Sequence, residues 1–188
     1  MQKRGMLSFL TRRRAEREAG ERIYAAIVAA SRRPAFYERL GVADTVSGRF
    51  EMLAVHFYPV VHRLMYVPDG DPGLARRISE IFVTDMDDAQ RALGIADLKV
   101  PKRMKSLYGA FAGRLKAYRE AIAEGNGALE RALERNVFPE GGAHGAAGSL
   151  AGYLAAAVGQ LETASLSELR AGRLPYPEPT FPEEGGAS

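Results

Sequence analysis

The stretch DLKVPKRMKSLYGAFAGRLKAY, from Asp97 to Tyr118, decides the fold class of this chain. The helix-stopping residue Pro101 lies near its start, and large apolar residues then recur at spacings of three and four. At about 100° per residue, residues with this spacing form one stripe along a helix. They are Met104, Leu107, Tyr108, Phe111, Leu115, Tyr118 and Ile122. The pattern predicts a long amphipathic helix that ends near Glu124.

The opposite side of this predicted helix is basic and contains two glycines. Residues 97–124 hold seven Lys or Arg and three Asp or Glu. Gly109 and Gly113 fall among the basic residues, where a glycine in an exposed helix costs about 1 kcal/mol relative to alanine. We therefore expect a partner to approach the backbone closely on this side. The predicted partner-binding residues are Lys99, Lys102, Arg103, Lys105, Gly109, Gly113, Lys116 and Arg119.

Similar periodicity predicts helices on both sides of this stretch, and no segment shows the sustained alternation of a strand. We expect helices over residues 12–31, 47–66 and 72–92, a short helical turn at 34–40, and shorter helices around 129–137 and 150–169. The 47–66 segment, with Phe57 on its inward stripe, is apolar over most of its circumference, which predicts a central, buried position. The chain is therefore expected to be an all-α, single-domain bundle of six or seven helices.

The two ends of the chain differ from this helical middle. We expect residues 1–11 to be a flexible basic N-terminus, residues 12–171 the helical domain, and residues 172–188 a Pro-rich disordered tail. Residues 1–33 carry a net charge of +6, whereas the remainder carries −3. The apolar pentad at residues 6–10 is flanked by basic residues, which suits contact with an anionic membrane surface. The alternative is an ordinary frayed start of a helix.

Composition excludes several classes of protein. The chain has 188 residues, 46% of them hydrophobic, a formal net charge of +3 and no cysteine. Disulfides, thiolate zinc sites and cysteine nucleophiles are therefore excluded. No apolar run is long enough to span a bilayer, and the apolar part of the N-terminus is too short for a secretory signal. We expect a bacterial cytoplasmic protein.

The sequence offers little catalytic chemistry. His56 and His62 are six residues apart and so lie on different faces of their helix, whereas a shared metal needs a spacing such as i, i+4. Asp85, Asp87 and Asp88 resemble the Mg²⁺-binding aspartates of a phosphate site, but no second acidic cluster faces them. The loop GGAHGAAGS, residues 141–149, lacks the lysine and the preceding strand of a phosphate-binding loop. We therefore expect no enzyme activity, no metal and no cofactor.

Three segments of the chain carry a family resemblance. The first is RPAFYERLGVADTVSGRFEMLAVHFYPVVHRL, from Arg33 to Leu64. The second is IFVTDMDDAQRALGIADL, from Ile81 to Leu98, which leads directly into VPKRMKSLYGAFAGRLKAY. In this order and adjacency the segments resemble the ubiquinol–cytochrome c chaperone family, which assists assembly of the respiratory cytochrome bc complex. The resemblance spans roughly residues 33–174, and none of its segments is a catalytic motif.

This resemblance implies a non-enzymatic assembly factor for the cytochrome b subunit of ubiquinol–cytochrome c reductase. Its expected partners are newly made or newly inserted cytochrome b, an anionic membrane surface at the inner face of the cytoplasmic membrane, and the ribosome, with no small-molecule substrate. Two alternatives remain open. One is a helical RNA- or ribosome-binding module that uses the basic face between Lys99 and Arg119. The other is an isoprenoid-synthase-like enzyme that uses Asp85, Asp87 and Asp88.

Overall fold

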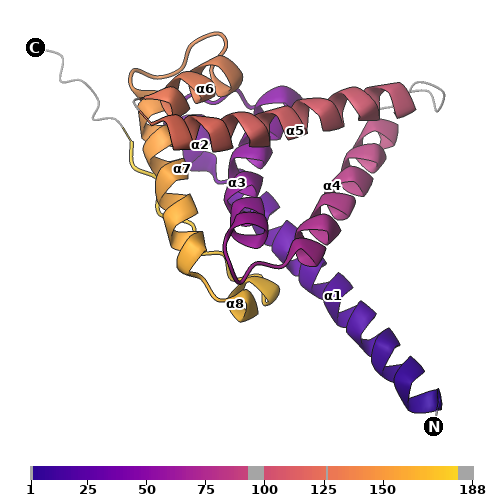
Figure 1. Cartoon of the computed structure of the whole chain (residues 1–188). Coiled ribbons are helices and arrows are strands. Elements are labelled where there is room, and N and C mark those ends of the chain that lie inside the picture. Colours follow the sequence, from indigo (N-terminus) through magenta and orange to yellow (C-terminus); the bar gives the residue numbers. More distant parts are fainter. Residues whose placement is uncertain (1, 93–99, 126, 182–188) are drawn as a thin grey trace, which may run out of the picture.

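The computed structural model describes residues 2–92, 100–125 and 127–181, with side chains from residue 13 onward. These residues form one all-α domain of eight helices and contain no strand, so the predicted fold class is confirmed (Figure 1). The helices are α1 (Gln2–Ser31), α2 (Pro34–Glu38), α3 (Val46–Tyr66), α4 (Pro72–Ala92), α5 (Val100–Glu124), α6 (Ala128–Val137), α7 (Ala146–Thr163) and α8 (Leu166–Arg170).

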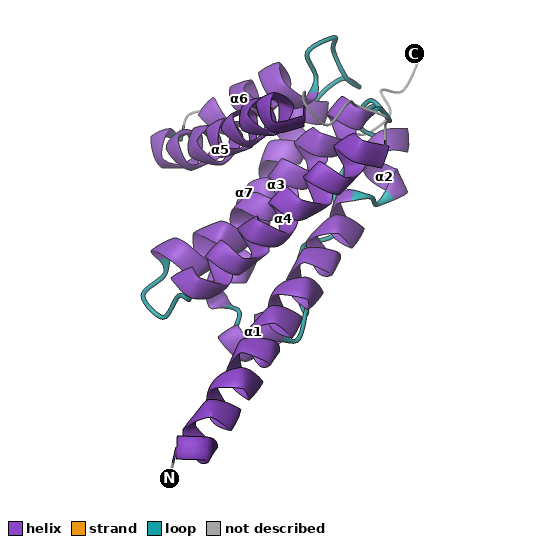
Figure 2. Ribbon diagram, turned by 90° about the vertical axis from the view of Figure 1, so that its right-hand side faces the viewer, coloured by secondary structure: helices purple, strands orange, loops and turns teal. Residues whose placement is uncertain are grey.

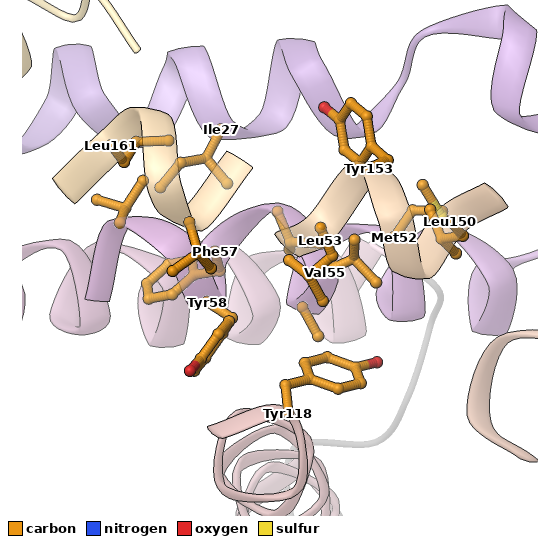
Figure 3. Packing of buried hydrophobic residues seen from close by; sticks show 14 of the residues in the cluster. Ile27, Met52, Leu53, Val55, Phe57, Tyr58, Tyr118, Leu150, Tyr153 and Leu161 are labelled. Atoms are coloured by element: carbon orange, nitrogen blue, oxygen red, sulfur yellow. The ribbon is translucent and has the colours of Figure 1, made fainter. Parts of the chain in front are cut away.

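Helix α3 lies at the centre of the bundle. The hydroxyl oxygen of Thr45 caps its start by accepting a hydrogen bond from the backbone N–H of Gly48 at 3.1 Å. Thirteen of the 21 residues of α3 are buried, and the helix contacts α1, α4, α5, α6 and α7. Figure 3 shows the side chains of α3 between Leu150 and Leu161 of α7 on one side and Tyr118 of α5 on the other. The predicted central position of this helix is confirmed.

A cluster of phenylalanines joins α3, α4 and α5. The rings of Phe82 in α4 and Phe111 in α5 stack with centroids 4.0 Å apart. Phe57 of α3 packs edge-on against both, at 5.8 Å and 5.0 Å. Aromatic pairs in such geometries contribute about 0.5–1.5 kcal/mol each beyond the area that they bury. The cluster thereby fixes α4 and α5 against the central helix (Figure 1).

Two helix boundaries differ from the prediction. Helix α1 begins at Gln2, ten residues before the predicted start, and its N-terminal part extends beyond the other helices (Figure 2). The predicted helix around 150–169 begins earlier, at Ala146, and is divided. Ala164 is extended, and Ser165 then starts α8 with a capping box, in which its side chain and that of Glu168 each bond the other's backbone N–H.

The sequence predicts a disordered tail from Gly172, whereas the structure lays residues 172–181 against the bundle without helix or strand. The Tyr176 hydroxyl donates a hydrogen bond to the backbone carbonyl of His56, at 2.5 Å. Arg33 donates to the carbonyl of Pro177, at 3.3 Å, and the Arg39 guanidinium lies 3.8 Å from the centroid of the Phe181 ring. Aromatic anchors therefore hold this segment where composition predicts disorder; residues 182–188 lie outside the described residues.

Candidate partner-binding surface

Helix α5 buries only one side. Its buried residues are Val100, Phe111, Tyr118 and Ala121. Seven of the eight predicted partner-binding residues can be located, and all seven are exposed, whereas Lys99 lies outside the described residues. They are Lys102, Arg103, Lys105, Gly109, Gly113, Lys116 and Arg119. The predicted helical phase is therefore correct for these residues, and their role in binding stays a prediction.

Five of these residues form a continuous strip, which we call the α5 basic face. At 3.6 residues per turn they fall within an arc of about 80° around the helix axis. They are Lys102, Lys105, Gly109, Gly113 and Lys116. Arg119 lies about 40° beyond one edge of this arc, and Arg103 lies about 80° beyond the opposite edge. The sequence-based prediction grouped all of these residues together and missed this division.

The lysines of the α5 basic face do little within the protein. Lys116 lies 3.7 Å from Glu120, with both side chains mostly exposed. Lys102 and Lys105 make no ion pair with the part of the chain that the structure describes. Exposed ion pairs typically contribute less than about 1 kcal/mol to stability. These charges are therefore available for association.

The two glycines of the face have no internal explanation. A Cβ atom added to Gly109 or Gly113 would have no heavy atom within 4 Å, and neither residue has a positive φ. By contrast, a Cβ on Gly48 would lie 1.9 Å from the carbonyl oxygen of Ala43, so that glycine is required by packing. The fold would therefore accept larger residues at 109 and 113.

The edge of α5 nearest the end of α3 is aromatic. Arg119 donates a hydrogen bond to the Tyr66 hydroxyl at 2.9 Å, and its guanidinium lies 5.3 Å from the ring centroid. Tyr66 is 51% exposed and Tyr108 is 50% exposed. The apolar periodicity of α5 placed Tyr108 on the buried stripe, but Tyr108 is exposed because it sits at the border of that stripe. Met65, in the last turn of α3, is also exposed.

The opposite edge of α5 is fixed to α3 by an ion pair. Arg114 donates from Nε and Nη2 to the Glu51 carboxylate, with the best contact on each at 2.9 Å, and Glu51 is buried. A bidentate pair of this kind sets the rotation of α5 about its own axis. The neighbouring Tyr118 hydroxyl is buried without a hydrogen-bond partner, and burial raises the pKa of this phenol. Arg114 is therefore structural, and it is not among the predicted partner-binding residues.

His56 and His62 both make contacts within the helical bundle. His56 is fully buried, with Nδ1 2.8 Å from the carbonyl of Met52 and Nε2 2.9 Å from the Tyr153 hydroxyl. Burial lowers its pKa to about 4, so the imidazole is neutral at pH 7. His62 instead pairs with Glu162 of α7, at 2.8 Å.

The aspartate cluster of α4 is used within the fold. Asp85 accepts a hydrogen bond from Tyr24 at 2.6 Å, and Asp87 pairs with Arg91 at 2.7 Å. Among the described residues no group of three or more His, Asp or Glu side chains could hold a metal ion. The arrangement therefore gives no support to the isoprenoid-synthase alternative. In the same part of the chain, no helix has the length and apolarity to cross a membrane.

Comparisons with known proteins agree on one family. The family model described as ubiquinol–cytochrome c chaperone matches residues 38–178, which include α3 to α8 and part of the docked tail. The crystal structure of the Cbp3 homolog from Brucella abortus matches with a TM-score of 0.81 and 36% sequence identity. The match covers 92% of this chain and 96% of the Brucella chain. No curated protein sequence matches significantly.

Proposed function

Because the chain belongs to the ubiquinol–cytochrome c chaperone family, we propose that it acts on the cytochrome b subunit of ubiquinol–cytochrome c reductase. Family membership gives a chaperone role in assembly of the cytochrome bc complex. The choice of cytochrome b as client, newly made or newly inserted, is our proposal. It includes a non-enzymatic mechanism: binding and release, without a small-molecule substrate.

The observation that carries this proposal is the α5 basic face. Its exposed lysines lack strong internal partners, and its two glycines have open space above them. A surface of this kind supports association with acidic groups at close range and adds nothing to folding. We propose that Lys102, Lys105 and Lys116 contact the client directly. Lys99, Arg103 and Arg119 lie near it in sequence and are proposed to contribute at its margins.

The proposed place of action is the cytoplasm, at the inner face of the cytoplasmic membrane. There the basic residues of α5 would meet both anionic lipid headgroups and the membrane subunit that the chaperone serves. Contact with the ribosome would bring the chaperone to cytochrome b during synthesis.

A second candidate function is RNA binding, and one observation favours it. Tyr108 is half exposed beside the α5 basic face, so an aromatic ring and lysines occupy neighbouring positions. Stacking on exposed aromatic rings and phosphate neutralisation are the usual means of binding single-stranded RNA. A steep decrease of RNA affinity with salt would support this function. If the chain does not bind RNA even at low salt, this function is excluded.

The test is a pull-down from membranes of the source organism with the full-length chain as bait. We expect cytochrome b to be enriched by the natural protein and depleted when Lys102, Lys105 and Lys116 are changed to Glu. Arg135→Glu, on the exposed side of α6, is the matched control and should leave the enrichment unchanged. Equal enrichment by all three baits would show that the α5 basic face is not the client site. No enrichment by any bait would remove cytochrome b as the client.

A further inference from the structure

We infer that the client surface is wider than the α5 basic face, and that it accepts an amphipathic helix with acidic residues along one edge. The surface adds Tyr66 and Tyr108 to the basic face, and we call the whole the α3–α5 surface. This inference rests on the proposed function, since it names the chemistry of the client segment that the chaperone would hold.

Most exposed large apolar side chains of the described residues belong to the last turn of α3, to α4 or to α5. Among the described residues the full set is Val46, Met65, Tyr66, Val83 and Tyr108. All except Val46 come from the last turn of α3, from α4 or from α5, the three helices that meet at the phenylalanine cluster (Figure 1). Half-exposed tyrosines are common anchors of protein interfaces, because a large rigid ring is buried at a small entropic cost.

Helical geometry places the two tyrosines on the same side of α5. Tyr108 and Arg119 are eleven residues apart, which is three turns plus about 20°. Arg119 binds the Tyr66 hydroxyl, so this side of α5 faces the end of α3. Tyr108 also follows Lys105 by three residues, about 60° around the helix. An aromatic edge therefore runs beside the α5 basic face.

Charge complementarity selects an acidic partner. Helix α5 contains six basic and two acidic residues, and one of the six, Arg114, is held by buried Glu51. The remaining cations are exposed. Lys105 and Lys116 are eleven residues apart, about 16 Å along the axis. Carboxylates at about this separation on a partner helix would meet both lysines.

The absence of side chains at Gly109 and Gly113 favours a helix over a lipid bilayer as the binding partner. Between Lys105 and Lys116, the α5 basic face carries only Gly109 and Gly113, and a Cβ atom added to either would meet no atom within 4 Å apart from the backbone of its own helix. A rigid helix gains van der Waals contact where side chains are missing, because its backbone can come closer. A fluid layer of lipid headgroups adapts to any relief and gains nothing from glycine. The lysines and tyrosines alone would suit both occupants, and the glycines distinguish them.

The experiment uses two labelled synthetic helices of about 20 residues, roughly 30 Å long. Both have one Ala- and Leu-rich face; the first has Glu along its edge and the second has Lys at the same positions. Binding to the full chain is measured by fluorescence anisotropy. We expect the Glu helix to bind and the Lys helix to bind at least about tenfold more weakly, a difference of 1.4 kcal/mol. Equal binding of the two helices would overturn the inference.

Variants then separate the aromatic and basic parts. Changing Tyr66 and Tyr108 together to Ser should weaken binding of the Glu helix at least about tenfold, at low and high salt alike. Changing Lys102, Lys105 and Lys116 to Glu should weaken it most at low salt, because salt screens exposed charges. Val46→Ser is the matched control, since Val46 is exposed at the far end of α3. Unchanged binding by the tyrosine variant, with its melting temperature retained, would overturn the inference.

Vesicles test the competing occupant. Vesicles of phosphatidylcholine and phosphatidylglycerol are mixed with the chain, and the tyrosine variant is compared with the natural protein. Stronger binding to vesicles than to the Glu helix, lost in the tyrosine variant, would assign the α3–α5 surface to the membrane and overturn the inference. If the Glu helix binds as expected but cytochrome b is not enriched in the pull-down, the surface stands and the client is wrong. If cytochrome b is enriched equally by the tyrosine variant, the client stands and this surface is wrong.

Discussion

Helices α3 and α5 are similar in length and opposite in surroundings. Of the 21 residues in α3, 13 are buried, whereas α5 buries four of 25. Helix α3 contains Pro59 in its interior and remains one helix, because neighbours enclose it. Helix α5 contains two exposed glycines that its fold does not need.

The difference separates stability from association. Substitutions at buried positions of α3 disturb its contacts with the helices that enclose it, so their cost should appear as loss of folding free energy. Substitutions on the α5 basic face disturb no internal contact beyond the exposed Lys116–Glu120 pair, so their cost should appear in binding. The predictions below test this separation, in order of expected effect.

The largest effect is expected at the phenylalanine cluster. Phe57 is fully buried, and Phe57→Ala should reduce the free energy of unfolding by about 3–5 kcal/mol, since it leaves a cavity between α3, α4 and α5. Urea denaturation measures the change, and Val46→Ala, exposed on the same helix, should alter it by less than about 0.5 kcal/mol. A loss below about 1 kcal/mol for Phe57→Ala would contradict a central role for α3.

A pH dependence should come from His56. The unfolded chain takes up its proton near pH 6.5, whereas burial lowers the pKa in the folded protein to about 4. Stability should therefore fall as the pH drops from about 6.5 to 4, by about 3 kcal/mol for this group. Denaturation curves at pH 7, 5.5 and 4 measure the slope. His56→Gln should flatten it, and an unchanged slope in that variant would assign the effect to other groups.

Two tyrosines provide a matched pair of smaller effects. Tyr153→Phe removes the hydrogen-bond partner of His56 Nε2 and should cost about 1–3 kcal/mol, because a buried polar atom is left unpaired. Tyr118→Phe removes a buried hydroxyl that has no partner, and should be neutral or stabilising by up to about 1 kcal/mol. Equal costs for the two variants would mean that the Tyr118 hydroxyl is hydrogen-bonded in solution.

Gly109→Leu should have opposite effects on folding and binding. Leucine is a better helix former than glycine, and with open space around position 109 it should stabilise the protein by about 0.5–1 kcal/mol. Its bulk should weaken client association, with little dependence on salt. Thermal melting and the cytochrome b pull-down measure the two effects. Unaltered client binding would show that nothing approaches this backbone.

The smallest effect on folding is expected from reversing Lys102, Lys105 and Lys116 to Glu. The melting temperature should remain nearly unchanged, because exposed charges contribute little to stability. Client association should weaken, most strongly at low salt. Unfolding of this variant would mean that the face is internal, and the contrast between α3 and α5 would fail.

Local patterns predicted α3, α4 and α5 well. The bounds of α3, α4 and α5 follow from the 3.6-residue period and from Pro72 and Pro101, and all of these signals act within a few residues of the position that they specify. The break before α8 also had a local signal, the Ser165–Glu168 capping box, which the apolar periodicity of the neighbouring residues masked.

Long-range contacts explain what the sequence did not predict. Tyr176 contacts His56 across 120 residues, and no local pattern specifies such a contact. Tyr66 is exposed because the chain turns away after α3, and Arg119 reaches it from another helix. The basic face was visible because it depends on one helix, whereas the aromatic edge depends on how two helices meet. The sequence therefore predicted the α5 basic face of the α3–α5 surface and did not predict its aromatic edge.

The docked tail has a consequence for the order in which the molecule is completed. Residues 172–181 follow all eight helices of the described structure, and they supply the hydroxyl that reaches the His56 carbonyl and the ring that lies beside the His56 imidazole. Until they emerge, this side of the central helix is open to water, although every helix has already been synthesised. Closure of the bundle therefore depends on residues that follow the last helix, α8, in the chain. A chain that stops before Tyr176 would contain all eight helices of the described structure but lack the segment that covers His56 of α3.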